Sequence, residues 1–229
     1  MKVRQLFDHD TWTYTYLVWD EKTKEAAIID SVKEKLDRDV KYIQDLGLTL
    51  KFALETHVHA DHITAAGLLR ERLGVKTAVH ADGGAKCADI QVQEGDEFYL
   101  GAQKLRAIHT PGHTSGDVTY AIDGALFTGD ALLIRACGRT DFQQGDSETL
   151  YHSITHKLFS YPDETIVYPG HDYDGFTEST IGEEKALNPR LGNDKPKSEF
   201  TDIMDNMNLP RPKRIDIAVP GNMACGLKH

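Results

Sequence analysis

The chain has 229 residues, with 26 lysines and arginines against 36 aspartates and glutamates, so its formal net charge is −10. That length fits one large domain or two small ones with enough chain to bury a substantial core. The negative balance argues against a nucleic-acid partner and against an anionic membrane surface, because both attract faces rich in lysine and arginine. No apolar run approaches the roughly 20 residues that cross a bilayer.

The cysteines and the N-terminus bear on the cellular compartment. Cys87, Cys137 and Cys225 are odd in number, far apart and free of any Cys-x-x-Cys pair. They predict a reducing compartment and no disulfide framework. The start, MKVRQLFDHDTW, has neither the apolar stretch of a secretory signal nor the acid-poor pattern of a transit peptide. We therefore expect a cytoplasmic location, and a mature mitochondrial form is left open.

The first part of the chain predicts strands that alternate with helices. Aromatic and β-branched runs around a charged turn are typical of a hairpin, and Ser31 with Glu34 forms a capping box at the start of a helix. The expected elements are strands over 12–19 and 26–29, a helix from Ser31 that stops at Gly47, a strand over 52–56, a helix over 63–73 that ends at Gly74, and a strand over 77–80.

The second part predicts shorter strands and two further helices. Asp123-Gly124 is a tight-hairpin signal, Asp146 and Ser147 start one helix, and Thr180 with Glu183 forms a second capping box. The expected elements are strands over 98–100, 105–108, 118–122, 126–128 and 165–168, a helix over 148–159, and a short helix from Thr180 to Pro189.

This order of elements predicts the fold class. Hairpins, then β-α units, then hairpins and β-α units again suggest two mixed sheets with helices outside, an α/β (α+β) fold arranged as a four-layer αββα sandwich. No linker is long enough to divide domains. We predict one domain over 1–229, with the Pro-, Asn- and Lys-rich segment 190–229 packed on it.

The main chemical signal is the run His57-Val58-His59-Ala60-Asp61-His62, which follows a buried strand and precedes a helix. Four side chains that can bind a metal lie within six residues, where they can converge on one point. The alternative reading is a polar turn in which aspartate and histidine cap the helix. The motif alone leaves both readings open.

Three more candidate ligands favour the metal reading. His113, Asp130 and His171 each follow a short apolar strand and lie beside glycine, which lets the backbone approach a ligand closely. Imidazole and carboxylate without thiolate suit Zn(II), Fe(II) or Mn(II). Spacing gives two sub-sites, one of His57, His59 and His113 and the other of Asp61, His62 and His171, with Asp130 able to bridge them. Spacing alone therefore predicts a dinuclear hydrolase.

The remaining histidines lack this setting. His9, His80, His152 and His156 are not in glycine-flanked loops at strand ends. His109 lies in a strand just before the His113 loop, where a core or surface role is expected ahead of a role around the metal.

The motif with His113, Asp130 and His171 resembles the metallo-β-lactamase superfamily. Longer blocks resemble its persulfide dioxygenase (ETHE1-like) family. These blocks are Ala136-Cys-Gly-Arg-Thr-Asp-Phe-Gln-Gln-Gly145, Tyr168-Pro-Gly-His-Asp-Tyr173, Leu187-Asn-Pro-Arg-Leu191 and Ile215-Asp-Ile-Ala-Val-Pro-Gly-Asn-Met223. Gly170 departs from the alanine expected in much of the family, and we expect it to affect loop stiffness more than chemistry.

The resemblance implies one Fe(II) per chain instead of two metal ions. His57, His113 and Asp130 would be its ligands, a two-histidine, one-carboxylate triad that leaves three positions open. The remaining motif histidines and aspartate, together with Tyr173, would act around the metal through hydrogen bonds. These residues are His59, Asp61, His62, His171 and Tyr173.

The implied reaction is oxidation of glutathione persulfide by O2 and water to sulfite and glutathione. Because glutathione carries two carboxylates, we expect Arg139 to bind it, with Arg214 and Arg190 as further candidates and Asp141 as the residue that holds Arg139. Cys137 is expected to be a buried, inert thiol. The alternative is a glyoxalase II-like dinuclear hydrolase of glutathione thioesters. A homodimer and a sulfurtransferase partner are left open.

Overall fold

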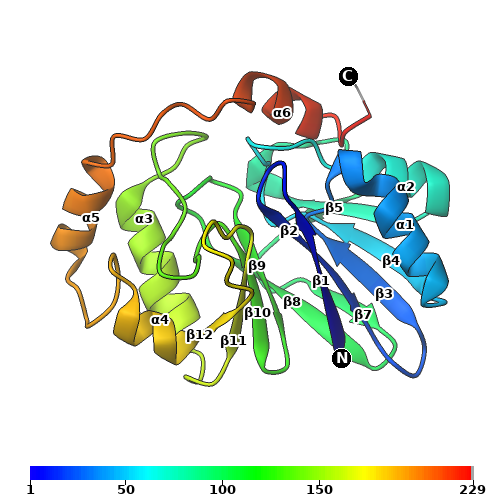
Figure 1. The fold of residues 1–229 in the computed structure, drawn as a ribbon, viewed down its shortest axis with the longest axis horizontal. Coiled ribbons are helices and arrows are strands. Elements are labelled where there is room, and N and C mark those ends of the chain that lie inside the picture. The colour runs from blue at the N-terminus through cyan, green and yellow to red at the C-terminus, as the bar shows by residue number, and fades with distance from the viewer. Residues whose placement is uncertain (228–229) are drawn as a thin grey trace.

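The computed structural model describes residues 1–227, which form two facing six-stranded sheets with helices on their outer sides (Figure 1). The first sheet has the strands in sequence order, namely β1 (Lys2–Asp8), β2 (Thr13–Trp19), β3 (Glu25–Ile29), β4 (Thr49–Leu54), β5 (Lys76–His80) and β6 (Ile90–Val92). The second sheet likewise contains β7 (Glu97–Leu100), β8 (Gln103–His109), β9 (Val118–Ile122), β10 (Ala125–Gly129), β11 (Ile166–Pro169) and β12 (Ser179–Thr180). The predicted αββα sandwich is confirmed.

Both sheets are mixed. Strands β1 to β3 are antiparallel neighbours, whereas β3 to β6 run parallel. Strands β7 to β10 are antiparallel, β11 runs parallel to β10, and β12 is antiparallel to β11. The parallel strands send their carboxyl ends toward the same edge, which is where polar loops can meet.

Strand β2 packs against apolar residues on both faces of its sheet. Tyr16 and Val18 pack between the two sheets, while Leu17 and Trp19, on the opposite face of the strand, pack under the helices. All seven residues of β2 are therefore buried. The alternation follows from the two-residue period of a strand.

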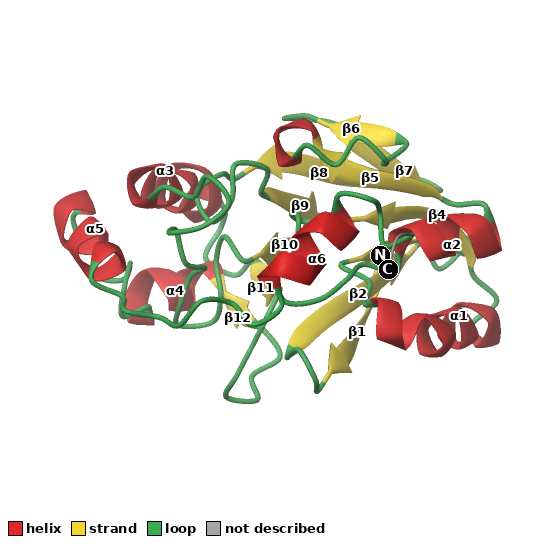
Figure 2. Ribbon diagram, turned by 90° about the horizontal axis from the view of Figure 1, so that it is seen from above, coloured by secondary structure: helices red, strands yellow, loops and turns green. Residues whose placement is uncertain are grey.

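The helices divide between the two outer faces. Helices α1 (Leu36–Asp45) and α2 (Ala66–Leu73) cover the first sheet, and α3 (Ser147–His152), α4 (Ile181–Leu187) and α5 (Lys197–Asp205) lie on the side of the second. Phe200 and Met204 of α5 pack with Leu126 and Val167 of the second sheet, so the C-terminal segment contributes to this core. Figure 2 shows α6 (Ile215–Asn222) lying centrally between the two groups.

Several local predictions are confirmed. Asp146 accepts a hydrogen bond from the Thr149 N–H at 2.7 Å, and Thr180 accepts one from Glu183 at 3.1 Å, so both residues cap their helices. Gly74 ends α2 in the left-handed conformation. The Asp123-Gly124 turn joins the antiparallel pair β9 and β10.

Other local predictions are wrong. Ser31 caps no helix, because its hydroxyl faces that of Thr64 at 3.4 Å and a 3-10 turn over Lys33–Lys35 precedes α1. The helix expected over 148–159 changes after α3 into a π-helical turn, Ser153–Lys157, and a 3-10 turn, Leu158–Ser160. Strands β1, β6 and β12 and helix α5 were not expected, because their patterns are short or polar.

The cysteine prediction also needs correction. Cys87 and Cys225 form a disulfide, with their Cα atoms 5.9 Å apart. The two residues are 138 positions apart in sequence, and they meet only because the segment after α6 returns to the turn that follows β5. The reducing compartment inferred from unpaired cysteines therefore loses its basis. Cys137 is free and buried, as expected.

None of the helices in residues 1–227 combines the length and the apolar character that a bilayer crossing requires. Lys228 and His229, which the predicted single domain includes, lie outside the described residues.

Candidate metal centre

The candidate ligands lie on loops that follow strands of both sheets. The His57–His62 loop follows β4, His113 lies between β8 and β9, Asp130 follows β10 and His171 follows β11. The fold brings His57, His113 and Asp130 together, so that one ligand atom of each lies within 4.8 Å of the others. His113 Nε2 is 3.6 Å from Asp130 Oδ2. These are the three residues that the resemblance implies as ligands.

Hydrogen bonds fix the ring nitrogen that each histidine presents. Thr56 donates its hydroxyl hydrogen to Asp30 at 2.8 Å, so its oxygen accepts from His57 Nδ1 at 3.0 Å. His113 Nδ1 donates to the Arg139 carbonyl at 2.6 Å. Both rings are thereby left with a free lone pair on Nε2. Burial and the neighbouring His59 and His113 hold the pKa of His57 well below its usual value, which favours the neutral, ligating form.

The donor set fits a transition metal ion. Two neutral imidazoles and one carboxylate suit Fe(II), Zn(II) or Mn(II). Within residues 1–227, Asp130 Oδ1 is buried without a hydrogen-bond partner. An unpaired buried carboxylate oxygen is unfavourable unless a cation compensates it.

A second group of candidate ligands lies beside the first. One ligand atom each from His59, Asp61 and His62 lies within 4.8 Å of the others. His171 Nε2 is 3.7 Å from Asp61 Oδ2 and 3.6 Å from Asp130 Oδ1. The Asp130 carboxylate therefore lies between both predicted sub-sites, and ligand geometry alone does not distinguish one metal ion from two.

His59 has partners that sequence reasoning missed. Its Nε2 lies 3.2 Å from Asp30 Oδ1 and 3.2 Å from Glu55 Oε2, and both carboxylates are buried. Burial opposes a charge on the ring, but Asp30 and Glu55 outweigh it and raise the pKa of His59 well above its usual value. Acidic residues directly after the buried strands β3 and β4 were the signal that could have revealed this pair.

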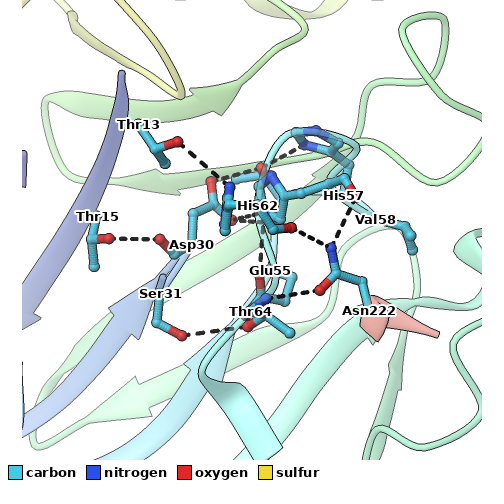
Figure 3. A network of polar contacts seen from close by, with 12 residues as sticks. Thr13, Thr15, Asp30, Ser31, Glu55, His57, Val58, His62, Thr64 and Asn222 are labelled. Carbon is cyan, nitrogen blue, oxygen red and sulfur yellow. Dashed lines mark hydrogen bonds and ion pairs between the residues drawn. The ribbon is translucent and has the colours of Figure 1, made fainter. Parts of the chain in front are cut away.

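The side-chain amides of two residues, Asn222 and Gln143, hydrogen-bond to the backbone of the His57–His62 loop and of Thr64. Asn222 of α6 donates to the carbonyls of His59 at 2.9 Å and His62 at 2.8 Å, and its Oδ1 accepts from the Thr64 N–H at 2.8 Å (Figure 3). Gln143 donates to the Val58 carbonyl at 2.7 Å. Asn222 and Gln143 both lie in blocks that resemble the family, and the sequence predicted a role for neither residue.

Comparisons with known proteins agree with this geometry. Residues 13–171 match the Metallo-beta-lactamase superfamily. The chain is 49% identical over 229 residues to "Persulfide dioxygenase ETHE1, mitochondrial" of Mus musculus and, equally, to that of Homo sapiens, covering 99% of this chain and 89% of each relative. The crystal structure of ETHE1 from Myxococcus xanthus superposes with a TM-score of 0.96 and 53% identity, covering 99% of this chain and 100% of that one.

The chain belongs to the persulfide dioxygenase family of the metallo-β-lactamase superfamily. The resemblance seen in the sequence is thereby confirmed. The similarity covers almost the whole chain, and so includes the segment after residue 171 that carries Asn222.

Two glycines of this family member lie against the candidate metal centre. A Cβ atom on Gly138 would be 2.5 Å from the Asp130 carbonyl oxygen and 2.8 Å from the His113 ring, so only glycine fits there without movement. A Cβ on Gly170 would be 2.6 Å from Asp130 Oδ1. Gly170 therefore faces the carboxylate itself, and the expectation that it affects loop stiffness more than chemistry stays a prediction.

Tyr173 lies at the surface beside the centre. Its ring is stacked on that of His171, with centroids 6.0 Å apart. The Trp12 ring lies beside it, with its centroid 6.2 Å from that of Tyr173. Partial burial of the hydroxyl and the nearby Asp130 and Asp61 carboxylates raise its pKa. The phenol therefore stays protonated and can donate a hydrogen bond.

The predicted substrate-binding residues differ in their surroundings. Arg139 binds Asp141 through two hydrogen bonds of 2.6 and 2.7 Å and donates to the Pro210 carbonyl at 2.8 Å. Arg190 donates to the Cys137 carbonyl at 2.6 Å. Arg214 pairs at 3.0 Å with Glu34, and both side chains are exposed. Their role in binding glutathione stays a prediction.

Proposed function

We propose that the protein is an Fe(II)- and O2-dependent persulfide dioxygenase, which oxidises glutathione persulfide to sulfite and glutathione. The main support for this proposal is that His57, His113 and Asp130 lie together in one group. The chain that holds them is similar over almost its full length to proteins named persulfide dioxygenase. One iron per chain would be held by these three residues.

Iron in this triad supplies redox chemistry and open coordination positions, which zinc, having no redox chemistry, cannot supply together. The chain's own residues hold the ligands. Thr56 keeps the lone pair of His57 on Nε2, and the Arg139 carbonyl does the same for His113. The rings are thereby prepared before the metal arrives, so little reorganisation is needed.

The other motif residues would act around the iron. Asp30 and Glu55 occupy Nε2 of His59, which supports a positioning role for His59. Asp61, His62 and His171 would orient water and the reacting groups by hydrogen bonds. Tyr173, protonated beside His171, would donate a hydrogen bond to the bound substrate.

For the glutathione carboxylates we favour Arg214. An exposed ion pair such as Arg214–Glu34 contributes little stability, so it can be exchanged for a substrate carboxylate at small cost. Arg139 uses its donors on Asp141 and on the segment before α6, and Arg190 uses one on Cys137. These contacts support a role for Arg139, Asp141 and Arg190 in ordering the loops that surround the substrate.

The test is O2 uptake and sulfite formation from glutathione persulfide by protein loaded with iron, with metal analysis of the same sample. We expect one iron per chain, consumption of O2, and no hydrolysis of a glutathione thioester. Two zinc ions per chain with thioester hydrolysis and no O2 uptake would overturn the proposal in favour of the glyoxalase II-like reaction. A homodimer, a sulfurtransferase partner and a cytoplasmic location stay predictions.

A further inference from the structure

A separate cluster of metal-binding side chains lies outside the proposed iron centre. His80 ends β5, Asp82 lies in the 3-10 turn Ala81–Gly83 that follows, and His109 ends β8 in the other sheet. One ligand atom of each residue lies within 4.8 Å of the others. The cluster shares no residue with the His57, His113 and Asp130 group.

The distances are close to those around a metal ion. Asp82 Oδ2 is 3.9 Å from His80 Nδ1 and 3.8 Å from His109 Nε2. Ligands on a tetrahedral zinc ion at about 2.0–2.1 Å are separated by roughly 3.4 Å, so each of these distances needs to shorten by about half an ångström. The Asp82 side chain is 61% exposed and its carboxylate accepts no hydrogen bond within residues 1–227, so it is free to move.

Charge also favours a cation at this position. The His80 and His109 rings are stacked, with centroids 3.9 Å apart and 16° between their planes. Burial, together with His109, lowers the pKa of His80 to about 4, so His80 is neutral at neutral pH. Asp82, Glu94 and Asp96 all attract positive charge toward this ring. A neutral imidazole that faces carboxylates is the combination that binds a divalent ion.

We propose that His80, Asp82 and His109 form a second binding site, for a divalent transition-metal ion of the Zn²⁺ class, completed by water on its exposed side. On binding, the ion replaces two weaker interactions. These are the hydrogen bond from the Asp82 N–H to His80 Nδ1 at 3.2 Å and the one from His109 Nε2 to the Ser115 carbonyl at 2.9 Å. His109 then carries its proton on Nδ1.

The site joins two parts of the fold that already touch. Ser115 donates its hydroxyl to the Asp82 carbonyl at 3.1 Å, and a Cβ on Gly116 would be 2.5 Å from the Gly83 nitrogen. Because His109 and Ser115 flank His113, an ion at this site fastens the loop that carries a proposed iron ligand to the end of β5. The ion therefore stabilises the folded protein without taking part in the reaction.

The experiment is a Zn²⁺ titration of the iron-loaded protein by equilibrium dialysis, with zinc and iron both counted. We expect one zinc per chain bound in addition to iron. His109→Asn and Asp82→Asn, both at partly exposed positions, should weaken zinc binding at least about tenfold while iron content stays unchanged. Addition of Zn²⁺ should raise the Tm of the wild-type protein and not that of His109→Asn.

The matched control is His156→Asn. His152 and His156 form another stacked pair, with ring centroids 4.3 Å apart. Both are exposed, His152 at the end of α3 and His156 in the π-helical turn that follows it. This variant should bind zinc as the wild type does. The proposal is overturned if the wild type binds no zinc beyond what replaces iron, or if His109→Asn and Asp82→Asn bind zinc as tightly as His156→Asn.

Discussion

The side-chain amide of Asn222 donates a hydrogen bond of 2.8 Å to the backbone carbonyl of His62. These residues are separated by 160 positions, yet the same amide also holds His59 and Thr64. Asn222 is 4% exposed, so water does not compete for these bonds. Helix α6 is therefore part of the structure that shapes the His57–His62 loop.

Asn222→Ala should lower both stability and iron affinity. Removal of the amide leaves two carbonyls and one N–H without partners in a buried position, and each orphaned group costs about 1–3 kcal/mol. We expect a lower Tm and iron bound at least severalfold more weakly, measured by thermal unfolding and by competition with a chelator. Asn206→Ala is the control, because Asn206 is exposed and bonds only its own helix. Iron affinity equal to that of the control would refute the role of Asn222.

Two substitutions distinguish the proposed iron ligand Asp130 from His59. Asp130→Ala should abolish iron binding, because the only carboxylate of the triad is lost. His59→Ala should lower the Tm, since Asp30 and Glu55 lose their shared partner, but should retain substantial iron. Metal content by elemental analysis checks both. Equal loss of metal in the two variants would favour a dinuclear centre.

The two glycines at the centre should respond differently to alanine. In Gly138→Ala the new Cβ meets the backbone carbonyl of Asp130, which cannot move without displacing the ligand, so we expect loss of most iron binding. In Gly170→Ala the Cβ meets Asp130 Oδ1, whereas the oxygen that faces His113 is Oδ2, so a small turn of the carboxylate relieves the contact and iron affinity should fall much less. Chelator competition on both variants measures the difference. Similar affinities in the two variants would contradict this explanation.

The arginines give a prediction about substrate binding. Arg214→Ala should raise the KM for glutathione persulfide with little change in kcat or Tm, because its partner Glu34 is exposed. Arg190→Ala should instead lower the Tm, since it removes a hydrogen bond to Cys137 in a largely buried region. Steady-state O2 uptake and thermal unfolding distinguish the two. An unchanged KM in Arg214→Ala would exclude this arginine from the substrate site.

Features that depend on a few neighbouring residues could be predicted from the sequence, whereas contacts between distant segments could not. Hairpins, the Asp146 and Thr180 caps and the sandwich follow from periodicity and turn residues, which act over a few positions. Strand ends and neighbouring glycines predicted that the candidate ligands meet, but the choice of His57, His113 and Asp130 as one group was implied by the family resemblance, not by spacing. The Asn222 contacts and the pairing of Cys87 with Cys225 join distant segments, so no local pattern contains them. The Asp30–Glu55–His59 group is only partly local, because Glu55 is four residues before His59 whereas Asp30 comes from another strand end.

The disulfide gives the last prediction. A cross-link between residues 138 positions apart restricts the unfolded chain and, in the chain-entropy model, stabilises the folded state by up to about 5 kcal/mol. Reduction should therefore lower the Tm of the wild type by several degrees, whereas Cys87→Ser should have that lower Tm with or without reductant. Thermal unfolding with and without dithiothreitol measures both. Because Cys225 lies three residues after Asn222, reduction should also weaken iron binding, though less than Asn222→Ala does. A wild-type Tm that reductant does not change would show that the cross-link contributes no stability.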